Sequence, residues 1–278
     1  MGACKASCSS CLSGWVSWVS SLSEYDRFAD IYQVWTETAS STQANLPFYV
    51  DAYLSEPGPV VELGVGDGRI AVAAALQGKS VVGVDLSTAM LEQCRARAER
   101  AGVLDRLTLL NADFRDFQLE QPAGLIALPY HSLGHLVALD DKRRAIAQVF
   151  SQLRPGGRFV FDDFLMTPSL VGHMRQVQLR AEYQLPSGAD ALLWVTSLVN
   201  EASQSLRVVT WEDELEPTGA LARRRYRRLS LSWLAPAQAR TMLTEAGFVI
   251  ESCFGNFDRT PFSDGTAREQ IWVARRPD

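Results

Sequence analysis

The chain has 278 residues, of which 47% are hydrophobic and 21% are charged. These proportions are typical of a globular protein with a large core and exclude an intrinsically disordered chain. The net charge of −5 and the pI near 5.4 argue against DNA or tRNA as a substrate, because proteins that depend on phosphate contacts usually carry a basic surplus.

The N-terminal segment, residues 1–22, is rich in serine and is expected to be poorly ordered. No apolar run approaches the roughly 20 residues that span a bilayer, and the N-terminus is a poor signal peptide, so we expect no membrane association and a cytoplasmic location. Cys4, Cys8 and Cys11 have a spacing that resembles an iron–sulfur motif. No strand precedes them to build a rigid cradle, so we interpret them as part of the poorly ordered segment.

Residues 24–54 carry apolar and aromatic side chains at helical spacing. Tyr25, Phe28 and Trp35 fall on one face of the first predicted helix. Pro47 is expected in the first turn of a second helix that ends at Leu54.

A regular alternation of short apolar strands and amphipathic helices follows, up to residue 164. The predicted strands are GPVVELGV, SVVGVDL, DRLTLLNAD, GLIALPY and GRFVFDDF, and a PGG turn at 155–157 stops the last helix before GRFVFDDF. Such alternation predicts an α/β fold with a doubly wound, mostly parallel sheet. FVIESCFG and REQIWVARR complete seven strands and are expected to form an antiparallel edge.

Residues 165–233 have a different pattern, with four long segments of period two joined by turn sequences. We predict an antiparallel β meander inserted in the sheet domain, which then comprises residues 23–164 and 234–278.

A glycine loop, VVELGVGDGRI, leaves the first predicted strand and opens a helix. Gly64, Gly66 and Gly68 would let a ligand approach backbone N–H groups at the helix start. Glu62 and Asp67 favour a cationic amino group, because a phosphate would be repelled by carboxylates so close. A nicotinamide cofactor is the alternative, but it predicts a G-x-G-x-x-G spacing that is absent here.

Acidic residues also close the next two predicted strands. Asp85 is placed to bind two ribose hydroxyls, and Asp113 with Phe114 is placed to bind and cover an adenine ring. Each residue also has a purely structural explanation: close packing for the glycines, a helix cap for Asp85 and a loop acid for Asp113.

Together these segments resemble the class I S-adenosylmethionine-dependent methyltransferases. The resemblance covers about residues 24–278 and lies in ELGVGDG, VDLS, NADF, LPYHSLGHL, LRPGG and LTEAGF. It implies S-adenosylmethionine as the cofactor, with Glu62 and the glycine loop at the methionine part, Asp85 at the ribose, and Leu86, Asp113 and Phe114 at the adenine.

A looser resemblance points to bacterial natural-product enzymes, including amino-sugar N-methyltransferases. It implies that the insertion at 165–233 forms part of the acceptor site. It also implies an N-terminal helical lid, with Tyr25 at the cofactor and Tyr32 at the acceptor, although both tyrosines are equally consistent with core packing. We expect methyl transfer to N or O of a small molecule. The alternative is a protein of the same fold that catalyses a non-methylating reaction, such as a cyclisation, or only senses the cofactor. Whether it forms a homodimer is left open.

The fourth predicted strand ends at LPYHSLGHL, where the acceptor usually meets the methyl group in this fold. Tyr130 and Asp163 are candidate substrate-binding residues, and His131 or His135 is the candidate base for a hydroxyl acceptor. The two histidines also suit metal binding, but no third ligand is near in sequence, so no metal is predicted. Helix capping by Ser132 and packing of His135 are the structural alternative.

Overall fold

The computed structural model describes residues 27–38, 40–263 and 267–278. Predictions for Tyr25 and for the Cys4–Cys11 segment lie outside the described residues, as does the predicted disorder of residues 1–22.

The larger sheet contains the seven predicted strands and has the order β10-β11-β5-β4-β1-β2-β3. All its strands are parallel except β11, which pairs antiparallel with both β10 and β5. The mostly parallel, doubly wound fold is thereby confirmed. The last two strands, β10 and β11, form the antiparallel pair that was predicted to end the sheet, with β10 at the edge. The strands are β1 (Val60–Leu63), β2 (Val81–Asp85), β3 (Leu107–Asn111), β4 (Ala123–Leu128), β5 (Leu153–Phe164), β10 (Val249–Phe254) and β11 (Glu269–Arg275).

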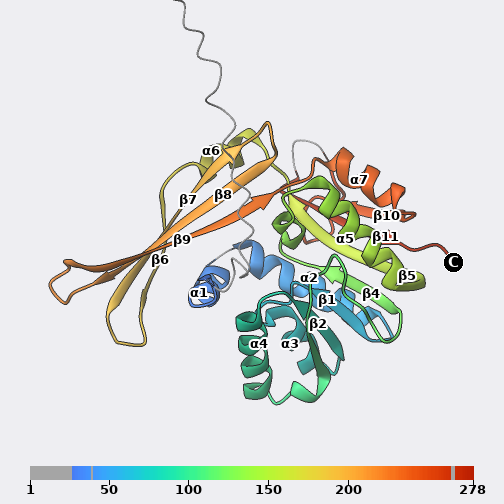
Figure 1. Cartoon of the computed structure of the whole chain (residues 1–278), viewed down its shortest axis with the longest axis horizontal. Coiled ribbons are helices and arrows are strands. Elements are labelled where there is room, and N and C mark those ends of the chain that lie inside the picture. The colour runs from blue at the N-terminus through green and yellow to red at the C-terminus, as the bar shows by residue number, and fades with distance from the viewer. Residues whose placement is uncertain (1–26, 39, 264–266) are drawn as a thin grey trace, which may run out of the picture.

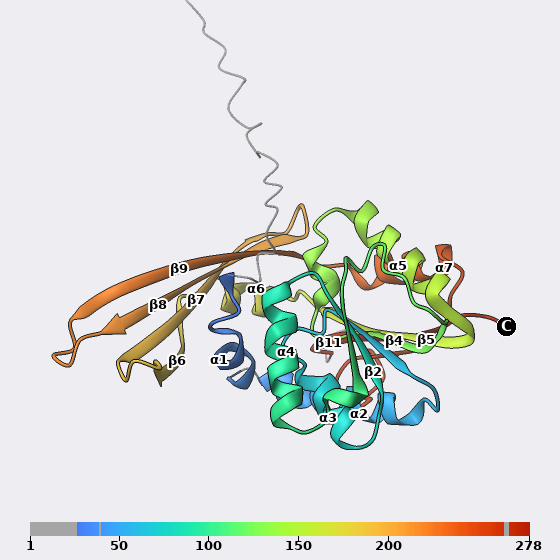
Figure 2. The same cartoon turned by 60° about the horizontal axis from the view of Figure 1, so that its bottom comes forward.

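Helices cover both faces of this sheet (Figures 1 and 2). On one face lie α2 (Ser40–Ser55), α3 (Arg69–Leu76) and α4 (Thr88–Arg100), and on the other lie α5 (Leu139–Gln152) and α7 (Pro236–Glu245). Alternate residues of the buried strands serve the two cores, as β4 shows with Ile126 on the α5 side and Leu125 on the α3 side. Burial on both faces explains why these strands are continuously apolar.

Two local expectations are wrong. Pro47 lies in the interior of α2 rather than in its first turn, because the helix begins at Ser40. The predicted PGG turn at 155–157 lies instead within β5, which begins at Leu153 directly after α5 ends at Gln152 and pairs irregularly with β4 between Ala123 and Leu125.

The insertion is a four-stranded antiparallel sheet in the order β6-β7-β8-β9, as predicted. It comprises β6 (Gln178–Gln184), β7 (Asp190–Asn200), β8 (Ser205–Leu215) and β9 (Leu221–Ser232), and it is preceded by the short helix α6 (Pro168–Met174), which the sequence did not predict. The sheet extends away from the larger one (Figure 1), and the short helix α1 (Tyr32–Glu37) lies beside it.

One face of the meander packs against the segment that leads into α1. Phe28 and Ile31 share a buried cluster with Leu193, Val208 and Leu229 of the meander. Asp30 pairs with Arg225 and Arg227 on β9, at 2.9 and 2.5 Å. These contacts hold α1 where the meander meets the carboxyl ends of the parallel strands.

Candidate active site

The glycine loop connects β1 to α3 at the carboxyl edge of the sheet. Gly64, Gly66 and Gly68 have φ values of 64°, 57° and 78°, in the left-handed region that favours glycine. A β-carbon on Gly68 would lie 2.5 Å from Cys94 Sγ, and one on Gly66 would lie 3.4 Å from the Tyr32 hydroxyl. The loop therefore needs glycine both for its backbone conformation and for close approach.

Glu62 is 2% exposed and lies on β1, beside the loop. It lines a small pocket together with Gly64, Arg69, Tyr32 and Tyr130. Its Oε2 atom has no hydrogen-bond partner among the described residues. Burial raises the pKa of Glu62 from 4.5 to about 8, although a hydrogen bond with Tyr53 and the positive charge of Arg69 act in the opposite direction. A buried carboxyl with one oxygen left without a partner is suited to receive a cation.

Arg69 is a pocket residue to which the sequence analysis gave no role. It opens α3, and its guanidinium donates to the Thr42 carbonyl oxygen at 2.7 Å and to Asn45 Oδ1 at 2.8 Å, both on α2. These neutral acceptors orient the guanidinium without neutralising it. The position of Arg69 directly after the glycine loop is the sequence signal from which a role in the pocket could have been predicted. The other loop acid, Asp67, is engaged by Arg97 of α4 in an ion pair.

Asp85 lies at the end of β2 with its carboxylate turned toward the glycine loop. Its Oδ2 accepts from Gly66 N at 2.9 Å and its Oδ1 accepts from Ser87 N at 2.8 Å. The next residue, Leu86, is 57% exposed. The Asp85 carboxylate therefore lies beside the glycine loop at the carboxyl end of β2, and its role at the ribose stays a prediction.

Asp113 and Phe114 follow β3. Arg115 donates from Nε to both oxygens of Asp113 at 3.0 Å, and this pairing lowers the pKa of the Asp113 carboxyl despite its partial burial. The same guanidinium also reaches Asp141 at 3.1 Å. Phe114 packs at the border of the core on the α5 side of the sheet. The adenine role of Asp113 stays a prediction in which the ligand shares this carboxylate with Arg115.

The loop after β4 has an unusual backbone, because Tyr130 and His131 have φ values of 59° and 57°. Asp162 of β5 holds both residues: its Oδ1 accepts from Tyr130 N at 2.9 Å and its Oδ2 from His131 N at 3.0 Å. The Tyr49 hydroxyl of α2 also donates to Oδ1, at 2.5 Å. Asp162 is thus a positioning residue that fixes where the Tyr130 side chain enters the pocket.

His131 is a buried cation rather than a free base. Its Nε2 is 2.8 Å from Glu269 Oε2 and 3.5 Å from Asp162 Oδ2, and its ring stacks on Phe164 with centroids 3.8 Å apart. Burial opposes protonation, but the negative charges of Glu269, Asp162 and Asp163 outweigh it and raise the pKa of His131 to about 9. At neutral pH its ring therefore carries both protons.

His135 and Asp163 are the remaining predicted residues of this region. His135 ends the short 3₁₀ helix Ser132–His135, and burial together with the charge of Lys142 lowers its pKa to about 3. Asp163 is 0% exposed and accepts hydrogen bonds from Phe164 N and Leu234 N, at 2.8 and 2.9 Å. Its assignment to substrate binding is corrected accordingly, because both oxygens are engaged in anchoring the chain after the meander.

Tyr32 lies over Gly66 and lines the same pocket as Tyr130, and its role toward the acceptor stays a prediction. Ser132 donates to the Pro129 carbonyl oxygen at 2.6 Å and packs against Gly64. Trp35, one turn after Tyr32 on α1, contributes a side-chain hydrogen bond that lowers the pKa of Tyr130, although burial raises it overall. Tyr32, Tyr130 and Trp35 therefore bring α1 against the loop after β4.

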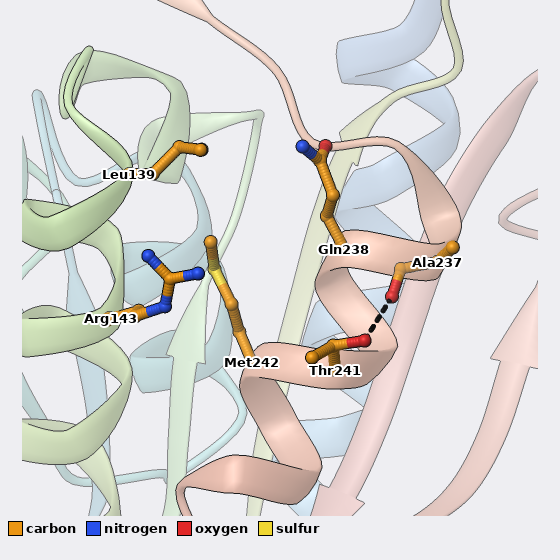
Figure 3. A pocket seen from close by; sticks show the side chains of 6 residues that line it. All are labelled: Leu139, Arg143, Ala237, Gln238, Thr241 and Met242. Carbon is orange, nitrogen blue, oxygen red and sulfur yellow. Dashed lines mark hydrogen bonds between the residues drawn. The ribbon is translucent and has the colours of Figure 1, made fainter.

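A second, open pocket lies between α5 and α7 (Figure 3). None of the predicted site residues lines it; its walls are Leu139, Arg143, Ala237, Gln238, Thr241 and Met242. Within the described part of the chain, no group of three or more His, Cys, Asp or Glu side chains could hold a metal ion. No described helix combines the length and apolar character needed to cross a membrane.

Comparison with known proteins agrees with this geometry. Residues 60–157 match the family described as a methyltransferase domain. The tRNA 5-carboxymethoxyuridine methyltransferase of Escherichia coli K12 is 34% identical over 114 residues, which cover 39% of this chain and 42% of that protein. The 27-O-demethylrifamycin SV methyltransferase of Amycolatopsis mediterranei is 29% identical over 164 residues, covering 53% of this chain and 59% of that protein. The chain thus spans about half the length of these curated relatives.

Similarity of structure extends further along the chain. The CcbJ methyltransferase of Streptomyces caelestis superposes with a TM-score of 0.75 at 24% identity, covering 92% of this chain and all of that one. At that identity the likeness establishes the shared fold.

The fold, the glycine loop with its buried acid, and the matched domain define a Rossmann-like, cofactor-binding class of protein. Residues 60–157 match a methyltransferase domain, and the fold of the chain is that of a solved methyltransferase, in agreement with the class I S-adenosylmethionine-dependent methyltransferases that the sequence motifs predicted. Its cofactor is S-adenosylmethionine, which related solved methyltransferases hold as such or as S-adenosylhomocysteine.

Proposed function

We propose that this protein transfers a methyl group from S-adenosylmethionine to a nitrogen of a small molecule in natural-product biosynthesis. The observation that carries the cofactor part is the pocket at the glycine loop. There the unpaired Oε2 of buried Glu62 and the guanidinium of Arg69 line one small space. An amino acid carries one ammonium and one carboxylate, so this pair of charges matches the methionine end of the cofactor.

The rest of the site fits the other parts of the cofactor. Asp85 would hold the ribose hydroxyls, and exposed Leu86 would lie against the adenine. Gly64 and Gly66 leave space that a β-carbon would partly fill. When bound, the cofactor supplies an electrophilic methyl group, and the protein's task is to hold an acceptor in line with it.

Nitrogen is favoured over oxygen as the acceptor because neither histidine is suited to remove a proton at neutral pH. His131 is already protonated, with a pKa near 9, and His135 is a very weak base, with a pKa near 3. A hydroxyl acceptor needs a base, whereas an amine attacks through the fraction that is already neutral. Asp162 and Glu269 keep the proton on His131, and Tyr32 and Tyr130 restrict water at the pocket.

The small-molecule and natural-product parts of the proposal are supported by the acidic net charge and by similarity to the rifamycin-modifying enzyme. The similarity to a tRNA-modifying methyltransferase argues against a small-molecule acceptor, but that similarity covers only 39% of this chain.

The test is incubation with S-adenosylmethionine labelled in the methyl group and a panel of small amines and alcohols. Label should move to amines in the wild type and not in an Asp85→Ala variant, which is expected to lose cofactor binding. The protein can be tested in the same way with metabolite extracts. If it binds the cofactor but transfers no label to any amine, alcohol or extract component, it is a sensor or a non-methylating enzyme.

A further inference from the structure

Arg180 lies on β6 of the meander, where the pairing with β7 shifts register between Leu179 and Ala181. Its guanidinium carbon is 5.0 Å from the centre of the Trp35 ring, and its Nη2 donates to the Trp35 carbonyl oxygen at 3.2 Å. It also interacts electrostatically with Tyr130, whose pKa it lowers. The side chain therefore lies where the meander, α1 and the loop after β4 meet.

The Arg180 charge has no counter-ion in the described part of the chain, where no carboxylate lies within 4.0 Å of it. Other arginines of the meander, such as Arg224 and Arg227, do pair with carboxylates. The Nε atom of Arg180 is buried and has no hydrogen-bond partner, and burial lowers the pKa of the guanidinium. A guanidinium nevertheless remains charged in proteins, and a half-buried one without a counter-ion costs free energy unless a ligand pairs with it.

We propose that Arg180 binds an anionic oxygen group, a carboxylate or a phosphate, on the methyl acceptor. This inference rests on the proposed function and deepens it, because it assigns the acceptor a negative charge close to its nucleophilic nitrogen. Tyr130 lines the cofactor pocket and also faces Arg180, so the two subsites share one wall. Stacking on Trp35 fixes the plane of the guanidinium, which prepares its free edge for two hydrogen bonds to an oxyanion.

A purely structural role is the competing explanation. In that case Arg180 would serve only to stabilise the fold, through its hydrogen bond to the Trp35 carbonyl oxygen. The two roles predict opposite effects on stability. If Arg180 serves a ligand, replacing it by glutamine removes an unpaired charge, and the melting temperature of the ligand-free protein should be unchanged or higher. A lower melting temperature together with unchanged anion binding would overturn the proposal.

The binding test uses the protein saturated with S-adenosylhomocysteine and, as separate probes, sodium pyrophosphate and sodium acetate. Titration calorimetry should show that Arg180→Gln weakens binding of at least one probe about tenfold or more, the scale of a lost charge-assisted hydrogen bond. Arg180→Lys, which keeps the charge but loses the planar fork, should give an intermediate affinity. The probe that binds more tightly identifies the anion as phosphate-like or carboxylate-like.

Arg228→Gln is the matched control, because Arg228 is an exposed arginine of the same sheet. It should leave the affinity for both probes unchanged. Equal weakening in both variants, or wild-type protein that binds neither probe, would overturn the proposal. The two hypotheses fail separately: loss of S-adenosylhomocysteine binding in the wild type would contradict the proposed function. Normal cofactor binding with anion binding independent of Arg180 would contradict this inference alone.

Discussion

The affinity for the cofactor should depend on pH through Glu62. Its pKa of about 8 means that only about one tenth of the ligand-free protein has this carboxyl ionised at pH 7. The cofactor's ammonium group binds the ionised form, so binding must release the proton. From pH 6 to 7 the dissociation constant of S-adenosylhomocysteine should fall about tenfold, and the gain should level off near pH 8. Calorimetry in two buffers of different ionisation enthalpy should detect release of about 0.9 proton at pH 7.

The same group affects the stability of the ligand-free protein. Because the folded pKa is raised from 4.5 to about 8, the folded state holds a proton that the unfolded chain releases. Stability therefore falls as pH rises between these two values, and the loss at pH 7 is on the order of 3 kcal/mol. Glu62→Gln, which cannot ionise, should melt at a higher temperature than the wild type at pH 8 but not at pH 4.5. It should also bind the cofactor weakly and without pH dependence.

Two results would refute this reasoning about Glu62. One is an affinity that does not change between pH 6 and pH 8 in the wild type. The other is the same pH dependence in the Glu62→Gln variant, which would place the titrating group elsewhere.

Three further predictions concern the loop, the ribose site and the histidine. Asp85→Ala should weaken cofactor binding about tenfold or more in calorimetry, and unchanged affinity would remove Asp85 from the site. Gly68→Ala should destabilise the protein by about 1–3 kcal/mol more than Gly102→Ala does in thermal unfolding. Both positions have positive φ, but only at Gly68 does the new β-carbon meet Cys94, so equal losses would contradict the packing argument. His131→Ala should lower turnover with an amine by less than about tenfold, whereas a loss of about 10²–10⁴-fold at unchanged cofactor affinity would identify His131 as a general base.

The sequence by itself determined the fold class and the location of the cofactor loop. The alternation of apolar strands with amphipathic helices is a local signal, and so is the change to period two after residue 164. The glycine loop was identifiable for the same reason, because its conformation depends on the residues of the loop itself. Both features depend on contacts between residues that are close in sequence, so they can be predicted from the sequence without knowledge of the fold.

The tertiary structure alone decided the chemistry around the acceptor. Tyr49 reaches Asp162 across 113 residues and His131 reaches Glu269 across 138, and these contacts turn a candidate base into a fixed cation. The contact with Glu269 depends on β11 lying next to β5, an arrangement that no local pattern encodes. Arg180 likewise had no role predicted from the sequence. Its unpaired charge became evident only once α1 and the loop after β4 were in place beside it, because burial and pairing are properties of the folded surroundings and not of the residue.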